Sequence, residues 1–180
     1  MENGTNKSPI PWIDSTGIPG SPWIAGSSAG DKASAEDFAA KLSAAPRSFW
    51  GRTAISAGID HAVQLLAESG LTATRRVIDV CGDGTNNAGR DVTIARDEAV
   101  AKGTTINGLP ILSANPMLWN PDHTNPPGGL AKYYRDNVIG GPTAFVRVAK
   151  DFNAFGEAII EKMVAEVSQA HRPAPQQAAR

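Results

Sequence analysis

The chain has 180 residues, and its 17 lysines and arginines nearly balance its 18 aspartates and glutamates. That balance argues against a protein that coats nucleic acid, because such proteins carry a basic excess. The single cysteine, Cys81, excludes an internal disulfide, and no apolar run reaches the roughly 18 residues that a membrane helix needs. The first residues show no signal-peptide pattern, so we expect a cytoplasmic protein without a membrane segment.

Composition divides the chain into three segments. Residues 1–33 are rich in Gly, Pro, Ser, Asn and Thr, which predicts loop or disordered structure. Residues 34–168 hold the periodic apolar patterns and are expected to form the folded domain. Residues 169–180 form a polar tail that we expect to be flexible.

Two helices are predicted at the start of the folded domain. Ser34 followed by Asp37 is similar to a capping box, and Pro46 ends the first helix. The second helix runs from Thr53 to Gly70, and Thr53 is a residue type that often caps a helix.

Helices and strands alternate along the rest of the domain. The predicted elements are a strand over 77–81, a helix over 91–102, a strand over 104–111, a helix over 130–138, a strand over 144–149 and a helix over 152–168. This order predicts an α/β fold, a mainly parallel sheet with helices on both faces. In the last helix, capped by Asp151, the spacing predicts an inward face of Phe155, Ile159, Met163 and Val167.

The segment Val77–Gly89, VIDVCGDGTNNAG, marks the expected site. Ligands of parallel sheets bind beyond the carboxyl ends of the strands, and the strand delivers Asp83 to that rim. Asp79 lies within the apolar strand and needs a partner, for which Arg75, Arg76 and backbone donors from the following loop are candidates. We expect a structural role for Asp79.

Several motifs agree in order and spacing with one family. VIDVCGDGTNNAG, the following ARDEAVAKGTTINGLPI and the later YYRDNVIGGPTAFVRVAKDF resemble a bacterial family of von Willebrand factor A-like proteins, catalogued as domain of unknown function 1194. The resemblance covers roughly residues 34–168. It implies a Rossmann-like three-layer fold and a metal-ion-dependent adhesion site, and it implies full-length relatives that are exported.

The resemblance also implies roles for individual residues. Thr53 and Asp83 match the second and third positions of the adhesion site, where they would contact Mg²⁺. Gly84, Asn86 and Asn87 lie in the loop that would touch a protein partner. The residues themselves leave alternatives open: Thr53 as a helix cap, Asp83 as a turn residue, and the two asparagines as ties within their own loop.

The chain departs from the family pattern at its first strand. The Asp-x-Ser-x-Ser loop is missing, and Asp14–Ile18 is the nearest string. The first strands of the fold are missing too, so the chain begins about where the third strand would lie, at Pro11–Ile13. Such a truncation leaves strand 77–81 with an open edge, and we expect self-association through it.

The leading function hypothesis is therefore a non-enzymatic binding module with a protein partner and an incomplete magnesium site. A small hydrolase or nucleotide-binding enzyme that uses Asp83 and Asp79 is one alternative, although the chain carries neither a phosphate loop nor a recognisable nucleophile–base pair. A gene fragment without a function of its own is the other alternative.

Overall fold

The computed structural model describes residues 31–44, 52–70, 72–73, 75–113, 118 and 120–170. Its elements are, in chain order, α1 (Lys32–Ala44), α2 (Ile55–Glu68), β1 (Arg76–Gly82), α3 (Val92–Ala101), β2 (Thr104–Pro110), α4 (Pro121–Thr124), α5 (Leu130–Tyr133), the π-helical turn η1 (Tyr134–Val138) and α6 (Phe155–Ala170). Residues 1–30, which include Pro11–Ile13 and Asp14–Ile18, lie outside the described residues, as do Pro46 and most of the predicted tail.

The sheet of the described chain is parallel. β1 pairs with β2 from Arg76 opposite Thr104 to Gly82 opposite Pro110. The predicted strand 144–149 is reduced to two isolated parallel bridges, Val146 to Gly108 and Ala149 to Ile111, on the other side of β2. A side chain interrupts regular pairing there, because Asn107 Oδ1 accepts the backbone N–H of Phe145.

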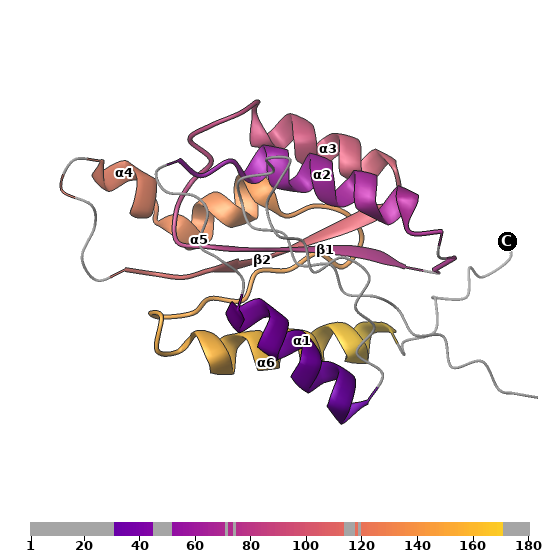
Figure 1. The fold of residues 1–180 in the computed structure, drawn as a ribbon. Helices are drawn as coiled ribbons and strands as arrows, with labels where there is room; N and C mark the ends of the chain where they lie inside the picture. Colours follow the sequence, from indigo (N-terminus) through magenta and orange to yellow (C-terminus); the bar gives the residue numbers. More distant parts are fainter. Residues whose placement is uncertain are drawn as a thin grey trace, which may run out of the picture.

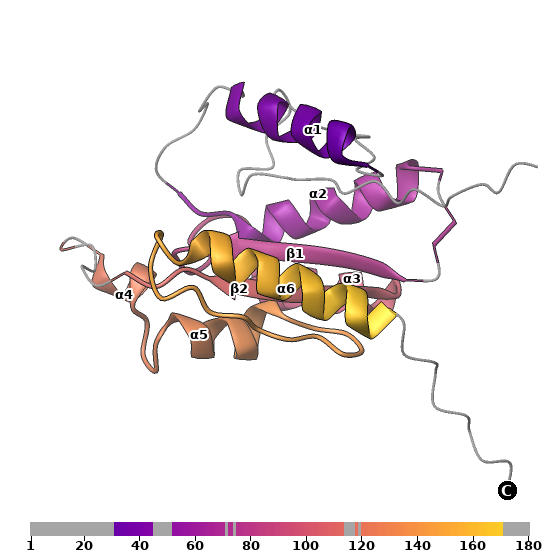
Figure 2. The same ribbon diagram turned by 90° about the horizontal axis from the view of Figure 1, so that it is seen from below.

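Helices cover both faces of this small sheet, in agreement with the α/β class. α2 and α3 lie on one face, and α6 lies on the other (Figure 1). α1 lies on the side of α6, beyond β1 and away from β2 (Figures 1 and 2). None of the described helices is long and apolar enough to cross a membrane.

Two apolar clusters hold the layers together. The larger one joins α2, α3, α5 and η1 to the sheet, and its members are Ile55, Ile59, Ala62, Ile78, Val92, Ala95, Ala99, Ile106, Leu130, Tyr134 and Val138. The smaller one lies under α6 and contains Leu109, Ile111, Ala149 and Ala158. Every residue of β2 is buried, whereas β1 is only partly covered.

The cap of α1 differs from the predicted one. Asp31 Oδ1 accepts the Ser34 N–H at 2.8 Å, and Ser34 Oγ accepts the Asp31 N–H at 3.1 Å. The capping box is therefore Asp31 with Ser34. Asp37 instead forms an ion pair with Lys41 one turn later, at 2.6 Å.

The inward face of α6 also differs from the prediction. Phe155 and Ile159 pack against the smaller cluster as expected, but Met163 is 43 % exposed and Lys162 beside it is 1 % exposed. The side chain of Val167 lies outside the described residues. The helix turns Lys162 toward the sheet because Asp79 on β1 offers it a carboxylate.

Candidate functional site

The loop Asp83–Arg90, called the rim loop below, follows β1 at the carboxyl end of the sheet. It lies at the left in Figure 1, where α2 begins and α4 is placed. Asp83 is exposed, and no hydrogen bond or ion pair within the described chain engages its carboxylate. The structure thus places Asp83 on the rim, as predicted from the sequence.

Two asparagines of the rim loop hold the start of α2. Asn87 Oδ1 accepts the Thr53 N–H at 2.7 Å, and Asn86 Oδ1 accepts the Ser56 N–H at 3.0 Å. The carbonyl of Thr53 in turn accepts the N–H of Asn87 at 2.9 Å. The cap residue of α2 is Ala54, whose side chain forms no hydrogen bond. Asn86 therefore supplies the acceptor for an N–H group in the first turn of α2. The predicted cap role of Thr53 is wrong.

The side chain of Thr53 contacts His123 of α4, which is buried. Thr53 Oγ1 lies 3.3 Å from His123 Nε2, while Thr85 Oγ1 and Asn87 Nδ2 lie 3.2 and 3.3 Å from Nδ1. Because Asn87 Oδ1 is used by Thr53, its Nδ2 faces the ring. Both ring nitrogens of His123 thus have polar neighbours, and the tautomer of the ring decides which of them donates.

Gly84 makes room for this imidazole. A Cβ at Gly84 would lie 2.3 Å from both Cε1 and Nε2 of His123. Gly84 is itself buried, so the contact predicted with a protein partner is replaced by packing inside the loop. His123 comes from a Pro-rich stretch of the sequence, and no spacing signal there links it to Thr53.

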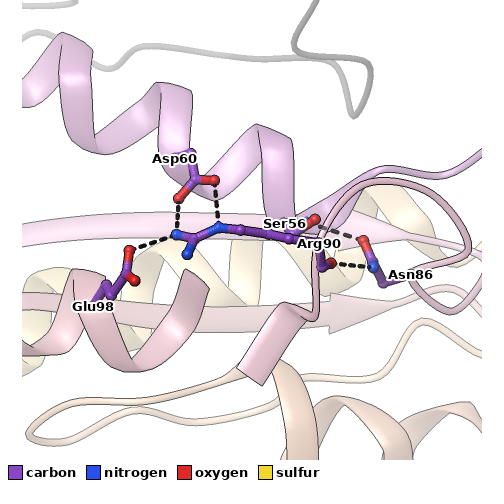
Figure 3. A network of polar contacts seen from close by, with 5 residues as sticks. All are labelled: Ser56, Asp60, Asn86, Arg90 and Glu98. Carbon is purple, nitrogen blue, oxygen red and sulfur yellow. Dashed lines mark hydrogen bonds and ion pairs between the residues drawn. The ribbon is translucent and has the colours of Figure 1, made fainter. Parts of the chain in front are cut away.

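Arg90 ties the other end of the rim loop to α2 and α3 (Figure 3). Its guanidinium donates to Asp60 at 2.9 and 2.5 Å and to Glu98 at 2.6 Å, and its carbonyl accepts from Asn86 Nδ2. The hydrogen bonds to Glu98 and Asp60 raise the pKa of Arg90, and the hydrogen bond from Arg90 lowers the pKa of Glu98. The loop is thus anchored at both ends.

A second polar cluster lies on the α6 face of the sheet. Lys162 donates to Asp79 and, at 2.6 Å, to Glu166, which also accepts from Asn107 Nδ2 at 2.6 Å. Lys162 is therefore the partner of Asp79, and the predicted partners Arg75 and Arg76 are wrong. Arg75 instead donates to the carbonyl of Glu166.

The pKa values of the two carboxyl groups in this cluster shift in opposite directions. Burial beneath α6 and the hydrogen bond to Glu166 raise the pKa of Asp79 to about 6. Burial also opposes ionisation of Glu166, but the hydrogen bonds from Asp79 and Lys162 outweigh it and lower its pKa. The single ammonium group of Lys162 pairs with both carboxyl groups. The cluster therefore favours a state in which one of these two groups keeps its proton.

Among the described residues, Thr53 and Asp83 do not complete a magnesium site. Thr53 and Asp83 can each supply one oxygen, and the oxygen of Thr53 is already hydrogen-bonded to His123. In the described ranges, no group of three His, Cys, Asp or Glu side chains is placed to hold a metal ion. An ion here would depend on water for most of its coordination.

Comparison with known proteins identifies the family but no characterised relative. The pattern of a family described as protein of unknown function (DUF1194) matches residues 22–171. No curated protein and no solved structure matched the chain. Because the match covers most of the 180 residues, the chain belongs to the family of proteins of unknown function DUF1194.

Proposed function

We propose that this chain is a non-enzymatic binding module of the von Willebrand factor A type, whose rim loop receives a protein partner through Asp83. One observation carries the proposal: Asp83 is exposed and has no partner in the described chain, whereas the polar side chains around it are tied down. Asn86 and Arg90 bond to α2, and Asn87 bonds to Thr53 just before it. A carboxylate on an anchored loop costs little ordering entropy when a partner binds it.

The same geometry argues against catalysis at the rim. Thr53 Oγ1 and His123 Nε2 are 3.3 Å apart, but the ring of His123 is buried and Thr85 and Asn87 contact its other nitrogen, so both residues serve the packing of the rim loop. Burial raises the pKa of Cys81 to about 11, which disfavours its thiolate. An exposed Asp83 beside the loop backbone would also repel a phosphate group.

The partner chemistry follows from the exposed charge. A lone carboxylate on an otherwise satisfied loop complements a lysine or arginine of the partner, and an arginine can bind it with two parallel hydrogen bonds. With Thr53 and Asp83 as the only matching ligands, Mg²⁺ is at most a weakly held addition in this proposal.

The test uses the full chain as bait in an extract of its source cells, with quantitative mass spectrometry. The variants are Asp83→Asn and, as a matched control, Asp122→Asn, an exposed aspartate on α4. We expect a protein that is retained by wild type and by Asp122→Asn and is at least tenfold depleted with Asp83→Asn. If every captured protein binds both variants equally, Asp83 is not the contact.

Metal dependence is tested on the same proteins. Calorimetric titration of Mg²⁺ into the purified chain should give no saturable heat below roughly millimolar concentration, because two ligands leave the ion mostly hydrated. Capture of the partner should survive EDTA. Tight binding of Mg²⁺ that disappears with Asp83→Asn would contradict this account and restore a metal-dependent mechanism.

A further inference from the structure

An amine and two carboxyl groups meet where α6 packs on the sheet. Asp79 of β1 lies opposite Asn107 of β2 in the strand pairing, and Lys162 and Glu166 lie one turn apart on α6. Lys162 Nζ donates to Asp79 Oδ1 and, at 2.6 Å, to Glu166 Oε1. Asp79 is also hydrogen-bonded to Glu166, so each of the three groups touches the other two.

The amine is the most deeply buried member of this group. Lys162 is 1 % exposed, while the side chains of Glu166 and Asp79 are 17 % and 34 % exposed. The ring of Phe145 lies over Nζ, with 5.8 Å between Nζ and the ring centroid. Burial penalises charge, so a reaction that replaces the ion pair of Lys162 and Asp79 with a neutral amide removes part of that penalty.

The two carboxyl groups are prepared for different roles in such a reaction. Burial and the hydrogen bond to Glu166 raise the pKa of Asp79 to about 6, so Asp79 keeps a proton more readily and its carboxyl carbon is the better electrophile. Burial opposes ionisation of Glu166, but the hydrogen bonds from Asp79 and Lys162 lower its pKa. Glu166 is therefore the carboxylate that can accept a proton.

We propose that Lys162 and Asp79 become joined by an intramolecular amide bond, which the folded chain forms by itself with Glu166 as the proton carrier. A proton first passes from the ammonium group of Lys162 to Asp79, which leaves a neutral amine beside a neutral carboxyl group. Nζ then attacks Cγ of Asp79. Glu166 accepts the proton that Nζ gives up and passes it to the departing hydroxyl, which leaves as water. One C–N bond forms and one C–O bond breaks, and the balance needs no oxidant or other co-reactant.

Proximity makes this condensation possible in water. Groups that are held in a reactive orientation reach effective molarities of about 10⁵–10⁸ M, which offsets the excess of water that otherwise favours hydrolysis of an amide. The groups meet only when α6 packs on β1, so the bond forms after folding. The freshly folded chain therefore still holds the ionisable pair.

The bond fixes α6 to the sheet. It links residues that are 83 positions apart, and a covalent link of that span restricts the unfolded chain as a disulfide does. This chain has one cysteine and hence no internal disulfide of its own. Neither Asp83 nor the rest of the rim loop takes part in the reaction, so the inference is independent of the proposed partner site.

Mass spectrometry of the denatured full chain tests for the bond. The wild type should be lighter than its sequence by about 18 Da, the mass of one water, and the linked fraction should grow while the folded protein is incubated. Protease digestion should then give a branched peptide that joins the fragment containing Asp79 to the fragment containing Lys162. A folded wild type that keeps its full mass, or that yields no branched peptide, overturns the proposal.

Two variants separate this bond from other losses of water. Lys162→Arg keeps the positive charge but lacks the amine, and should form no branched peptide. Glu166→Gln keeps a hydrogen-bonding side chain but removes the base, and should slow formation of the bond roughly tenfold or more. Circular dichroism checks that each variant is folded, and the branched peptide of the wild type decides the case even where a variant is not.

The sequence Asp83-Gly84 provides the competing explanation for a loss of water. Asp83 can close a cyclic imide on the backbone nitrogen of Gly84, with the same change in mass, and that loss would persist in Lys162→Arg. Equal losses of mass in the wild type and Lys162→Arg would therefore overturn the proposal. Equal rates in the wild type and Glu166→Gln would contradict the role of Glu166.

Discussion

Gly84 is the residue on which the packing of the rim loop depends most directly. Gly84→Ala would place a methyl group 2.3 Å from two ring atoms of His123, which is itself held by Thr53 and Thr85. Overpacking of a buried site typically costs about 1–3 kcal/mol, and we expect a loss of that size in the free energy of unfolding. Urea denaturation followed by circular dichroism measures it.

Gly156→Ala is the matched control for this substitution. Gly156 lies in the first turn of α6, and a Cβ there would meet nothing within 4 Å. Alanine is favoured over glycine in helices, so this variant should be as stable as the wild type or more stable. If Gly84→Ala were equally harmless, His123 would not be fixed by the loop.

For single residues, the sequence predicts where a residue lies in the fold better than which side chains it contacts. Asp83 follows an apolar strand, and that local pattern sufficed to place it on the rim. His123 comes from a distant Pro-rich loop, and its contact with Thr53 exists only once α4 folds against α2. No local pattern encodes such a contact, which is why the core of the loop network was missed.

The docking of α6 depends on the cluster of Asp79, Lys162 and Glu166 between helix and sheet. Folding raises the pKa of Asp79 from 3.8 to about 6, so between these values the folded chain binds a proton more tightly than the unfolded chain. The stabilising contribution of Asp79 is therefore complete below about pH 4 and is lost as the pH rises through about 6. The lowered pKa of Glu166 acts in the opposite sense. Its stabilising contribution is present at neutral pH and is lost as the pH falls through the folded-state pKa of Glu166.

This linkage predicts a pH-dependent difference between wild type and Asp79→Asn. Relative to the variant, the wild type should lose stability as the pH rises from about 4 to about 7, measured by urea denaturation at each pH. Asp122→Asn, which alters an exposed carboxyl far from α6, should follow the wild-type profile. Parallel profiles for wild type and Asp79→Asn would show that Asp79 keeps its ordinary pKa in the folded chain.

The rotation of α6 shows where prediction from periodicity fails. An apolar pattern assigns Met163 to the core because methionine is more hydrophobic than lysine. In the fold, strand alternation places Asp79 on the α6 face of β1, and Lys162 turns inward to pair with its carboxylate while Met163 stays 43 % exposed. The order of most elements was predictable because apolar spacing is local, whereas the caps and the facing side chains depend on the partner element.

β2 is the central strand of the fold. Ile106 and Gly108 donate to Gly140 and Phe145 on one side, while β1 pairs along the other. Among the described residues, β1 pairs only with β2, and α1, whose side chains are almost all exposed, lies beyond it (Figure 2). The parallel order was predictable from the alternation of elements, but the weak third strand was not, because Asn107 captures a backbone donor there.

This asymmetry predicts a hierarchy of amide hydrogen exchange. β2 should exchange slowest because its amides are buried and bonded on both sides, β1 should be intermediate, and α1 should exchange fastest. An isolated helix of 13 residues is marginal in water, so α1 gains little protection without packing. Exchange followed by mass spectrometry in dilute solution gives this order. Equal protection of α1 and β2 in dilute solution would instead mean that α1 is packed as firmly as the centre of the sheet.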